Sequence, residues 1–256
     1  SSSAASDVYK RQFYDKTICA DDILQKGKKS LEIKPIAHIR TDFDEKFGIP
    51  RQSGLCSLLE GKIVFEPEFA KRESVRGLEE FSHIWLIWQF SENPPTSSLT
   101  VRPPRLGGNK RVGVFASRSP FRPNSLGLSC VRLKSIEYSS SGEPVINVFG
   151  ADLCDKTPIF DIKPYVPLSD CVPDALEGYT KKTKEHILSV HIPEEKGLLL
   201  PKNKLAALKE ILQLDPRPGY DDSPEKLYGL NFAGYNIKFS VKNDVLCVSD
   251  IEKIKR

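Results

Sequence analysis

The stretch Gly61-Lys62-Ile63-Val64-Phe65 is a short run of β-branched and aromatic residues that begins at a glycine. Runs of the same kind recur before and after it, separated by clusters of Gly, Pro, Asn and Ser, at residues 33–39, 84–90, 111–115, 128–133 and 144–149. Short strands bounded by turn residues are typical of antiparallel sandwiches and barrels. We therefore predict a mainly β protein whose principal domain, residues 31–174, is an antiparallel β-barrel, with one helix inserted at 70–81.

The sequence changes character on both sides of this region. Residues 1–30 open on a serine-rich stretch, and we interpret them as a tail or remnant with a possible short helix at 17–29. In the last part, apolar residues at 205, 208, 211 and 212 share one face of a predicted helix over 202–214, which Pro216 ends. Predicted strands follow at 230–240 and 245–248. Residues 175–256 are thus expected to form a small α+β C-terminal domain.

Composition excludes several classes of protein. Hydrophobic residues make up 39% of the 256 residues and charged residues 28%, which is ordinary for a globular chain. The longest apolar run, 84–88, is far shorter than the roughly 18 residues that a membrane-spanning helix needs. The six cysteines show neither a Cys-x-x-Cys pair nor zinc-ligand spacing, and no signal segment precedes them. We expect a soluble cytoplasmic protein with reduced thiols and no metal.

Positive charge is concentrated in one segment. The net charge is only +4, but residues 101–134 hold eight basic side chains and no acidic one. Such a block favours a polyanionic partner, although a solvated basic loop is the alternative. The side chains that we predict to contact RNA are Arg102, Arg105, Lys110, Arg111 and Arg122.

Three segments are too polar and too rich in glycine and proline for a barrel core: 47–52, 101–109 with 117–129, and 152–165. Proline fixes φ and glycine permits close approach, so these segments are expected to hold a rigid shape around a ligand or partner. In the last one, strand alternation places Asp161, Lys163 and Tyr165 on one face, where they could position a substrate or take up a proton. The alternative is a surface turn with an Asp–Lys pair, and a turn-capping role is equally open for Asp155.

The strings Arg-Ser-Pro-Phe-Arg-Pro-Asn-Ser-Leu-Gly-Leu-Ser (118–129) and Asp-Ile-Lys-Pro-Tyr (161–165) resemble signatures of the TrmO (TsaA-like) family. Val-Arg-Gly-Leu-Glu-Glu-Phe-Ser-His-Ile-Trp (75–85) resembles a third, and 215–220 resembles the C-terminal extension of its bacterial members. The resemblance runs from about residue 31 to the end of the chain. One departure is Lys156, where family members commonly carry glycine.

The resemblance implies a function that composition and spacing do not reveal. It implies S-adenosylmethionine-dependent methylation of N6 of threonylcarbamoyladenosine beside the anticodon, at position 37 of threonine tRNA, by a homodimer. It assigns the segment that ends at Tyr165 to the active site, and we predict Asp155, Asp161, Lys163 and Tyr165 as its catalytic residues. It places cofactor binding on Pro50, Arg51, Gln52, Ser91, Glu92, Arg118, Leu128, Leu153, Cys154, Asp155, Lys156 and Thr157.

Other interpretations stay open at this level. An RNA-binding barrel without catalysis would use the basic block and need no methyl donor. An acid–base hydrolase using Asp155 and Asp161 lacks a paired histidine or metal cluster. His83, Trp85 and Trp88 are expected to pack in the core.

Overall fold

The computed structural model describes residues 32–93, 98–103, 106, 110–182, 187–217 and 226–254. The predicted tail, the possible helix at 17–29 and Arg105 lie outside these residues. Residues 35–256 form one compact unit. No helix within the described part of the chain is long and apolar enough to cross a bilayer.

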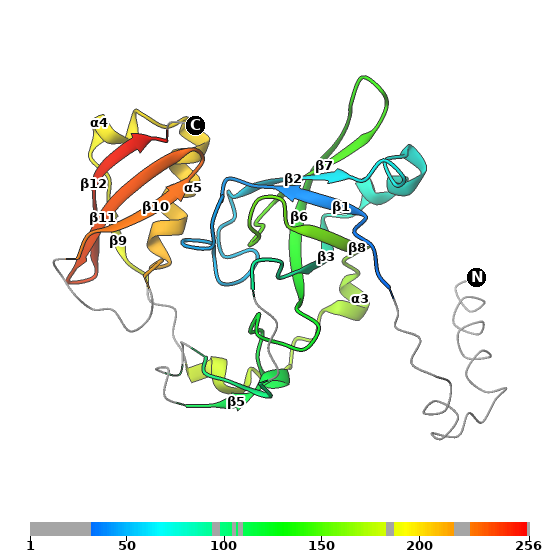
Figure 1. The fold of residues 1–256 in the computed structure, drawn as a ribbon, viewed down its shortest axis with the longest axis horizontal. Coiled ribbons are helices and arrows are strands. Elements are labelled where there is room, and N and C mark those ends of the chain that lie inside the picture. The colour runs from blue at the N-terminus through cyan, green and yellow to red at the C-terminus, as the bar shows by residue number, and fades with distance from the viewer. Residues whose placement is uncertain are drawn as a thin grey trace. The chain divides into compact units, whose positions relative to one another are not determined.

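Six strands close into an antiparallel barrel in the order β1-β2-β7-β6-β3-β8 (Figure 1), which confirms the predicted fold class. Their bounds are β1 Ala37–Arg40, β2 Glu60–Phe65, β3 His83–Gln89, β6 Leu126–Tyr138, β7 Pro144–Phe149 and β8 Pro158–Pro164. Thus 126–129 and 158–164, which were expected to be ligand-shaping segments, also supply barrel strands.

Alternation along β3 decides which side chains fill the barrel. Ile84, Leu86 and Trp88 point inward and are buried. His83 and Trp85 alternate to the opposite face and are only half-buried, so the prediction of core packing is right for Trp88 and wrong for these two. The Trp85 indole instead donates a 3.0 Å hydrogen bond to Asp170.

The predicted helix at 70–81 is wrong. Two 3-10 turns occupy the segment, η1 Arg72–Val75 and η2 Leu78–Glu80. Arg76 between them is extended and Gly77 has a φ of 82°, so an α-helix cannot run through this point. The predicted strand at 111–115 is likewise shorter, because β5 Val112–Gly113 pairs with β4 Thr100–Val101 and then turns into η4 Val114–Ala116.

The last part of the chain forms a second sheet in the order β10-β11-β12-β9. The short elements α3 and η5 precede β9 in the chain, and α4 and α5 lie between β9 and β10. The bounds are α3 Pro167–Asp170, η5 Gly178–Lys182, β9 Ser189–His191, α4 Glu194–Gly197, α5 Lys202–Gln213, β10 Tyr228–Phe232, β11 Tyr235–Lys242 and β12 Val245–Lys253. The predicted strand 230–240 is therefore two strands, because Ala233 and Gly234 both have positive φ and turn the chain.

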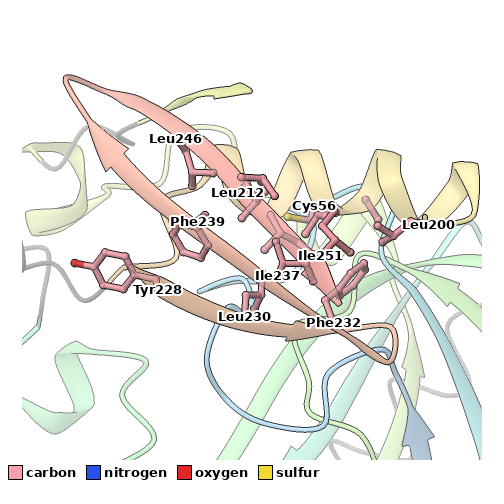
Figure 2. Close-up of a cluster of buried hydrophobic side chains, with 14 of the residues drawn as sticks. Cys56, Leu200, Leu212, Tyr228, Leu230, Phe232, Ile237, Phe239, Leu246 and Ile251 are labelled. Carbon is pink, nitrogen blue, oxygen red and sulfur yellow. The ribbon is translucent and has the colours of Figure 1, made fainter. Parts of the chain in front are cut away.

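Buried side chains of this sheet pack against α5, as Figure 2 shows. Phe239 and Leu246 project from β11 and β12 toward Leu212 on the helix. Phe43, Cys56 and Leu59, which belong to the segment between β1 and β2, are part of the same cluster. Glu210 on α5 adds hydrogen bonds of 2.9 Å from the Ser57 hydroxyl and from the backbone N–H of Leu58. The β1–β2 segment is thus held by apolar packing and by a carboxylate.

Candidate cofactor pocket

A cavity of about 460 Å³ lies where β3 ends and β6 begins, next to the paired residues Gln89 and Leu126. Its volume is in the range of small-molecule sites. Nine of the predicted cofactor residues line it: Pro50, Arg51, Gln52, Ser91, Glu92, Arg118, Leu128, Cys154 and Thr157. Folding therefore brings together side chains from four separate segments of the chain.

The cavity wall includes two aromatic rings in contact. The Trp88 and Phe90 ring centroids lie 4.3 Å apart in an edge-on arrangement. Gly127 on β6 makes room for this arrangement, because a Cβ there would lie 2.3 Å from the Trp88 ring. An aromatic wall of this kind can accept a flat heterocycle.

Four basic side chains line the cavity: Lys46, Arg51, Arg118 and Arg122. Arg118 donates a 2.6 Å hydrogen bond to the side-chain oxygen of Gln52. Lys46 donates to the backbone carbonyl of Glu92. Arg122, predicted to contact RNA, also lines the cavity and donates a 3.1 Å hydrogen bond to the carbonyl of Ser117. Arg122 therefore shapes the loop that carries Arg118.

Three predicted cofactor residues do not line the cavity. Leu153 is buried in the barrel core. Asp155 accepts hydrogen bonds of 2.8 Å from the Arg40 guanidinium and 3.0 Å from the backbone N–H of Thr41. It therefore fixes the 152–157 loop against the chain after β1.

Lys156 is exposed and has a φ of 65°, a left-handed conformation that favours glycine. Lys156 thus takes a conformation that is more costly for lysine than for glycine. The backbone N–H of Lys156 donates a 2.7 Å hydrogen bond to the carbonyl of Ile39, which holds the turn.

Three of the four predicted catalytic residues, Asp161, Lys163 and Tyr165, lie on the outer face of β8 and just beyond it. Asp155 lies apart from them, in the loop before β8. The Lys163 ammonium lies 3.1 Å from the Asp161 carboxylate, and both side chains are largely exposed. The Tyr165 ring contacts Trp85, with centroids 5.9 Å apart. Partial burial raises the pKa of the Tyr165 phenol, with smaller contributions from Cys171, Cys130 and Asp170. At neutral pH Tyr165 is therefore a hydrogen-bond donor and a poor base.

One cross-strand row connects this face with the cavity. Ile87 on β3 pairs with Leu128 on β6 and with Asp161 on β8. Leu128 lines the cavity, and neighbouring strands lie about 4.8 Å apart, so Asp161 is roughly 10 Å from Leu128 across the sheet. An acceptor placed along this row could therefore contact both.

Three other predicted RNA contacts, Arg102, Lys110 and Arg111, lie at the β4–β5 ribbon. Val101 pairs with Val112, so Arg102 and Arg111 come at the same end of the ribbon. Both side chains are exposed, as is Lys110, and the Arg111 guanidinium donates a 2.7 Å hydrogen bond to the Thr100 hydroxyl.

Comparison with known proteins agrees with this fold. Residues 38–171 match the tRNA-methyltransferase O N-terminal domain, and residues 193–254 match the TrmO C-terminal domain. The chain belongs to the TrmO family. The predicted resemblance to the family is thus confirmed.

Two bacterial relatives and one solved structure match this chain over nearly their whole length. A tRNA (adenine(37)-N6)-methyltransferase of Escherichia coli is 38% identical over 221 residues, which span 83% of this chain and 94% of that protein. A putative S-adenosylmethionine-dependent methyltransferase of Pseudomonas aeruginosa is also 38% identical, over 86% of this chain and 96% of its own. A TrmO crystal structure from P. aeruginosa superposes with a TM-score of 0.73 at 32% identity, covering 90% of this chain and all of that one.

Sequence reasoning missed several cavity residues, among them Lys46, Phe90 and Asp152. Asp152 is the one with the most unusual environment. It lines the cavity, yet in the sequence it is one polar residue in a motif with several. Its neighbour Ser129, 23 positions away, is what distinguishes it, because Ser129 donates it a 2.6 Å hydrogen bond. No pattern within either segment indicates that contact.

Proposed function

We propose that this chain transfers a methyl group from S-adenosylmethionine to N6 of adenine 37 in tRNA, and that its acceptor is threonylcarbamoyladenosine in threonine tRNA. The names of its relatives support the reaction and the donor. The observation that carries the proposal is the row Leu128–Ile87–Asp161, because it joins a cofactor-sized cavity to an exposed Asp–Lys pair on the same face.

The cavity suits a donor that combines a flat base with charges of both signs. Trp88 and Phe90 would contact the adenine, and Arg51 and Arg118 would bind the amino-acid carboxylate. The donor supplies an electrophilic methyl group on a sulfonium. The side chains of this protein would hold that methyl group in line with the acceptor nitrogen.

The outer face suits the modified base. A threonylcarbamoyl group ends in a carboxylate, which the Lys163 ammonium would pair with. Asp161 would then lie beside the acceptor amine and take its proton, and Tyr165 would donate a hydrogen bond to the carbamoyl oxygen.

Positioning is the larger catalytic contribution in this proposal. Orientation can lower a barrier by about 7–11 kcal/mol. One general base accelerates a reaction about a hundred- to ten-thousand-fold, which corresponds to a barrier lower by only about 3–5 kcal/mol. The proposal therefore needs no cysteine or histidine nucleophile.

We also propose that the protein acts in the cytoplasm as a homodimer, as the family resemblance implies. Large apolar side chains support a covered surface next to the site: Leu128 is 54% exposed and Leu168 is 96% exposed. A second copy of the chain would cover them. Light scattering coupled to size-exclusion chromatography should give twice the 28.7 kDa mass of one chain.

Equilibrium dialysis with S-adenosylmethionine separates this function from the alternative of a non-catalytic RNA-binding barrel. The enzyme should bind the donor without tRNA, because the cavity is formed by one chain's own loops. A protein that binds tRNA but not the donor would be the RNA-binding barrel.

A further inference from the structure

Asp152 is held in a fixed place on the cavity wall. Its neighbours Ala151 and Leu153 are both buried in the barrel core. The backbone before them is anchored where the N–H of Gly54 donates a 2.9 Å hydrogen bond to the carbonyl of Gly150. The side chain of Asp152 alternates to the other side and lines the cavity.

A chain of hydrogen bonds orients the Asp152 carboxylate. The Trp88 indole N–H donates to the Ser129 hydroxyl at 2.9 Å, and that hydroxyl donates to Asp152 Oδ1 at 2.6 Å. Ser129 is fully buried, so its only proton is committed to Asp152. A carboxylate has about four acceptor positions, which leaves Asp152 capacity for a ligand.

Burial disfavours a charged Asp152. Burial raises the pKa of Asp152 to about 6, while the Ser129 hydrogen bond, the backbone N–H groups of Asp152 and Ser53, and the Arg118 charge act in the opposite direction. The other charged or titratable side chains on the cavity wall are Lys46, Arg51, Glu92, Arg118, Arg122 and Cys154. Burial raises the pKa of the Cys154 thiol, so it is neutral at physiological pH.

Asp152 and Glu92 are the two acidic residues among those that line the cavity in the described part of the chain. Glu92 is exposed, where water screens its charge. Asp152 is shielded and pre-oriented, so a cation beside it would interact more strongly. A methyl donor of the sulfonium class carries positive charge at its sulfur and at its α-ammonium group.

We propose that Asp152 is the residue that binds the positively charged part of the methyl donor. This inference rests on the proposed function, since it takes S-adenosylmethionine as the occupant of the cavity. It makes Asp152 a binding and positioning residue, beyond the motif residues discussed above. A cation beside Asp152 would displace its proton, so donor binding should release a proton near pH 6.

The test compares three ligands on the wild-type protein and on Asp152→Asn, by titration calorimetry. S-adenosylmethionine has both cations, S-adenosylhomocysteine keeps only the ammonium, and methylthioadenosine has neither. Asp152→Asn should weaken the binding of S-adenosylmethionine at least tenfold and leave the affinity for methylthioadenosine unchanged. An equal loss for S-adenosylhomocysteine places the ammonium at Asp152, whereas a smaller loss places the sulfonium there.

Two variants serve as matched controls. Glu143→Gln removes an exposed carboxylate of the turn between β6 and β7, which does not line the cavity, and should change donor affinity less than twofold. Ser129→Ala removes the hydrogen bond but keeps the Asp152 carboxylate. It should therefore reduce donor affinity less than Asp152→Asn does. Loss of donor affinity in Glu143→Gln but not in Asp152→Asn would overturn the inference, and so would an equal loss of all three ligands in Asp152→Asn.

A second measurement needs only the wild-type protein. Calorimetry at pH 6 in two buffers of different ionisation enthalpy should show proton release with S-adenosylmethionine and none with methylthioadenosine. Equal proton exchange for both ligands would contradict the inference. If the wild-type protein bound no donor, both the proposed function and this inference about Asp152 would be wrong. If the donor bound without proton release and Asp152→Asn bound it equally well, only this inference would fail.

Discussion

The Arg118 guanidinium donates a 2.6 Å hydrogen bond to the side-chain oxygen of Gln52, 66 residues earlier in the chain. This contact joins the loop after η4 to the loop between β1 and β2, and both line the same cavity. The family resemblance assigns both residues to the cofactor. Their contact shows how the fold brings two separate motifs to one site.

Removal of either cavity arginine should reduce donor affinity without unfolding the barrel. Arg51→Ala and Arg118→Ala truncate exposed loop side chains, so the melting temperature should stay close to that of the wild type. Donor affinity should fall about tenfold or more, because a charge-assisted hydrogen bond contributes about 1.5–3 kcal/mol. Calorimetry and thermal melting test the two expectations. Wild-type affinity in both variants would place the donor elsewhere.

The outer-face residues should affect turnover and leave donor binding unchanged. Asp161→Asn and Tyr165→Phe keep side-chain shape but remove the charge or the hydroxyl. Single-turnover methylation at saturating donor should slow by roughly a hundredfold or more, the lower end for one positioned acid–base group. Glu195→Gln is a matched control, because it makes the same kind of change on an exposed residue of α4. Near-wild-type rates in both variants would show that the segment is a structural turn without a catalytic role.

Binding of tRNA should weaken with salt. Each phosphate contact contributes a log–log slope of about −0.9 on a B-form duplex and about −0.7 on single strands. Arg102→Glu with Arg111→Glu should reduce tRNA affinity and flatten the slope, while donor affinity stays unchanged. Filter binding across a salt series measures both. A slope near zero for the wild-type protein would exclude the basic ribbon as the RNA contact.

Asp152 should make the ligand-free protein less stable as pH rises. Its pKa is raised from 3.8 to about 6 in the folded state, so between these values the folded state binds more protons than the unfolded state. The free energy of unfolding therefore falls as pH increases from about 4 to 6. Asp152→Asn lacks this loss, and its melting temperature relative to the wild type should rise by a few degrees over that interval. A pH-independent difference would show that Asp152 titrates normally.

The sequence predicts the barrel because its strands alternate and are bounded by turn residues, as at β2 and β3. It does not predict the break at Gly77, because the apolar spacing of 70–81 also fits a helix and the positive φ is a backbone property. The split of 230–240 has a weak local signal in Gly234. Strand β9 is missed because three residues in a polar segment are ordered by pairing with β12.

The candidate site, like the fold, is only partly predictable from local sequence patterns. Motifs locate Pro50, Arg118 and Thr157, which line the cavity. They do not locate Asp152, whose environment depends on Ser129 and Trp88 reaching it from other strands. Long-range contacts of this kind leave no periodic pattern in the sequence. Pairing also explains why Asp161 and Lys163 lie on the outer face, a consequence of β8 register against β3.

The most direct test of the proposed function is mass spectrometry of nucleosides from threonine tRNA incubated with the protein and S-adenosylmethionine. Two tRNA samples should be compared, one carrying threonylcarbamoyladenosine at position 37 and one with unmodified adenosine there. The proposed function predicts a gain of one methyl group on the threonylcarbamoyladenosine of the first sample and no methylation of the second. Methylation of unmodified adenosine, or of neither sample by a protein that binds the donor, would contradict it.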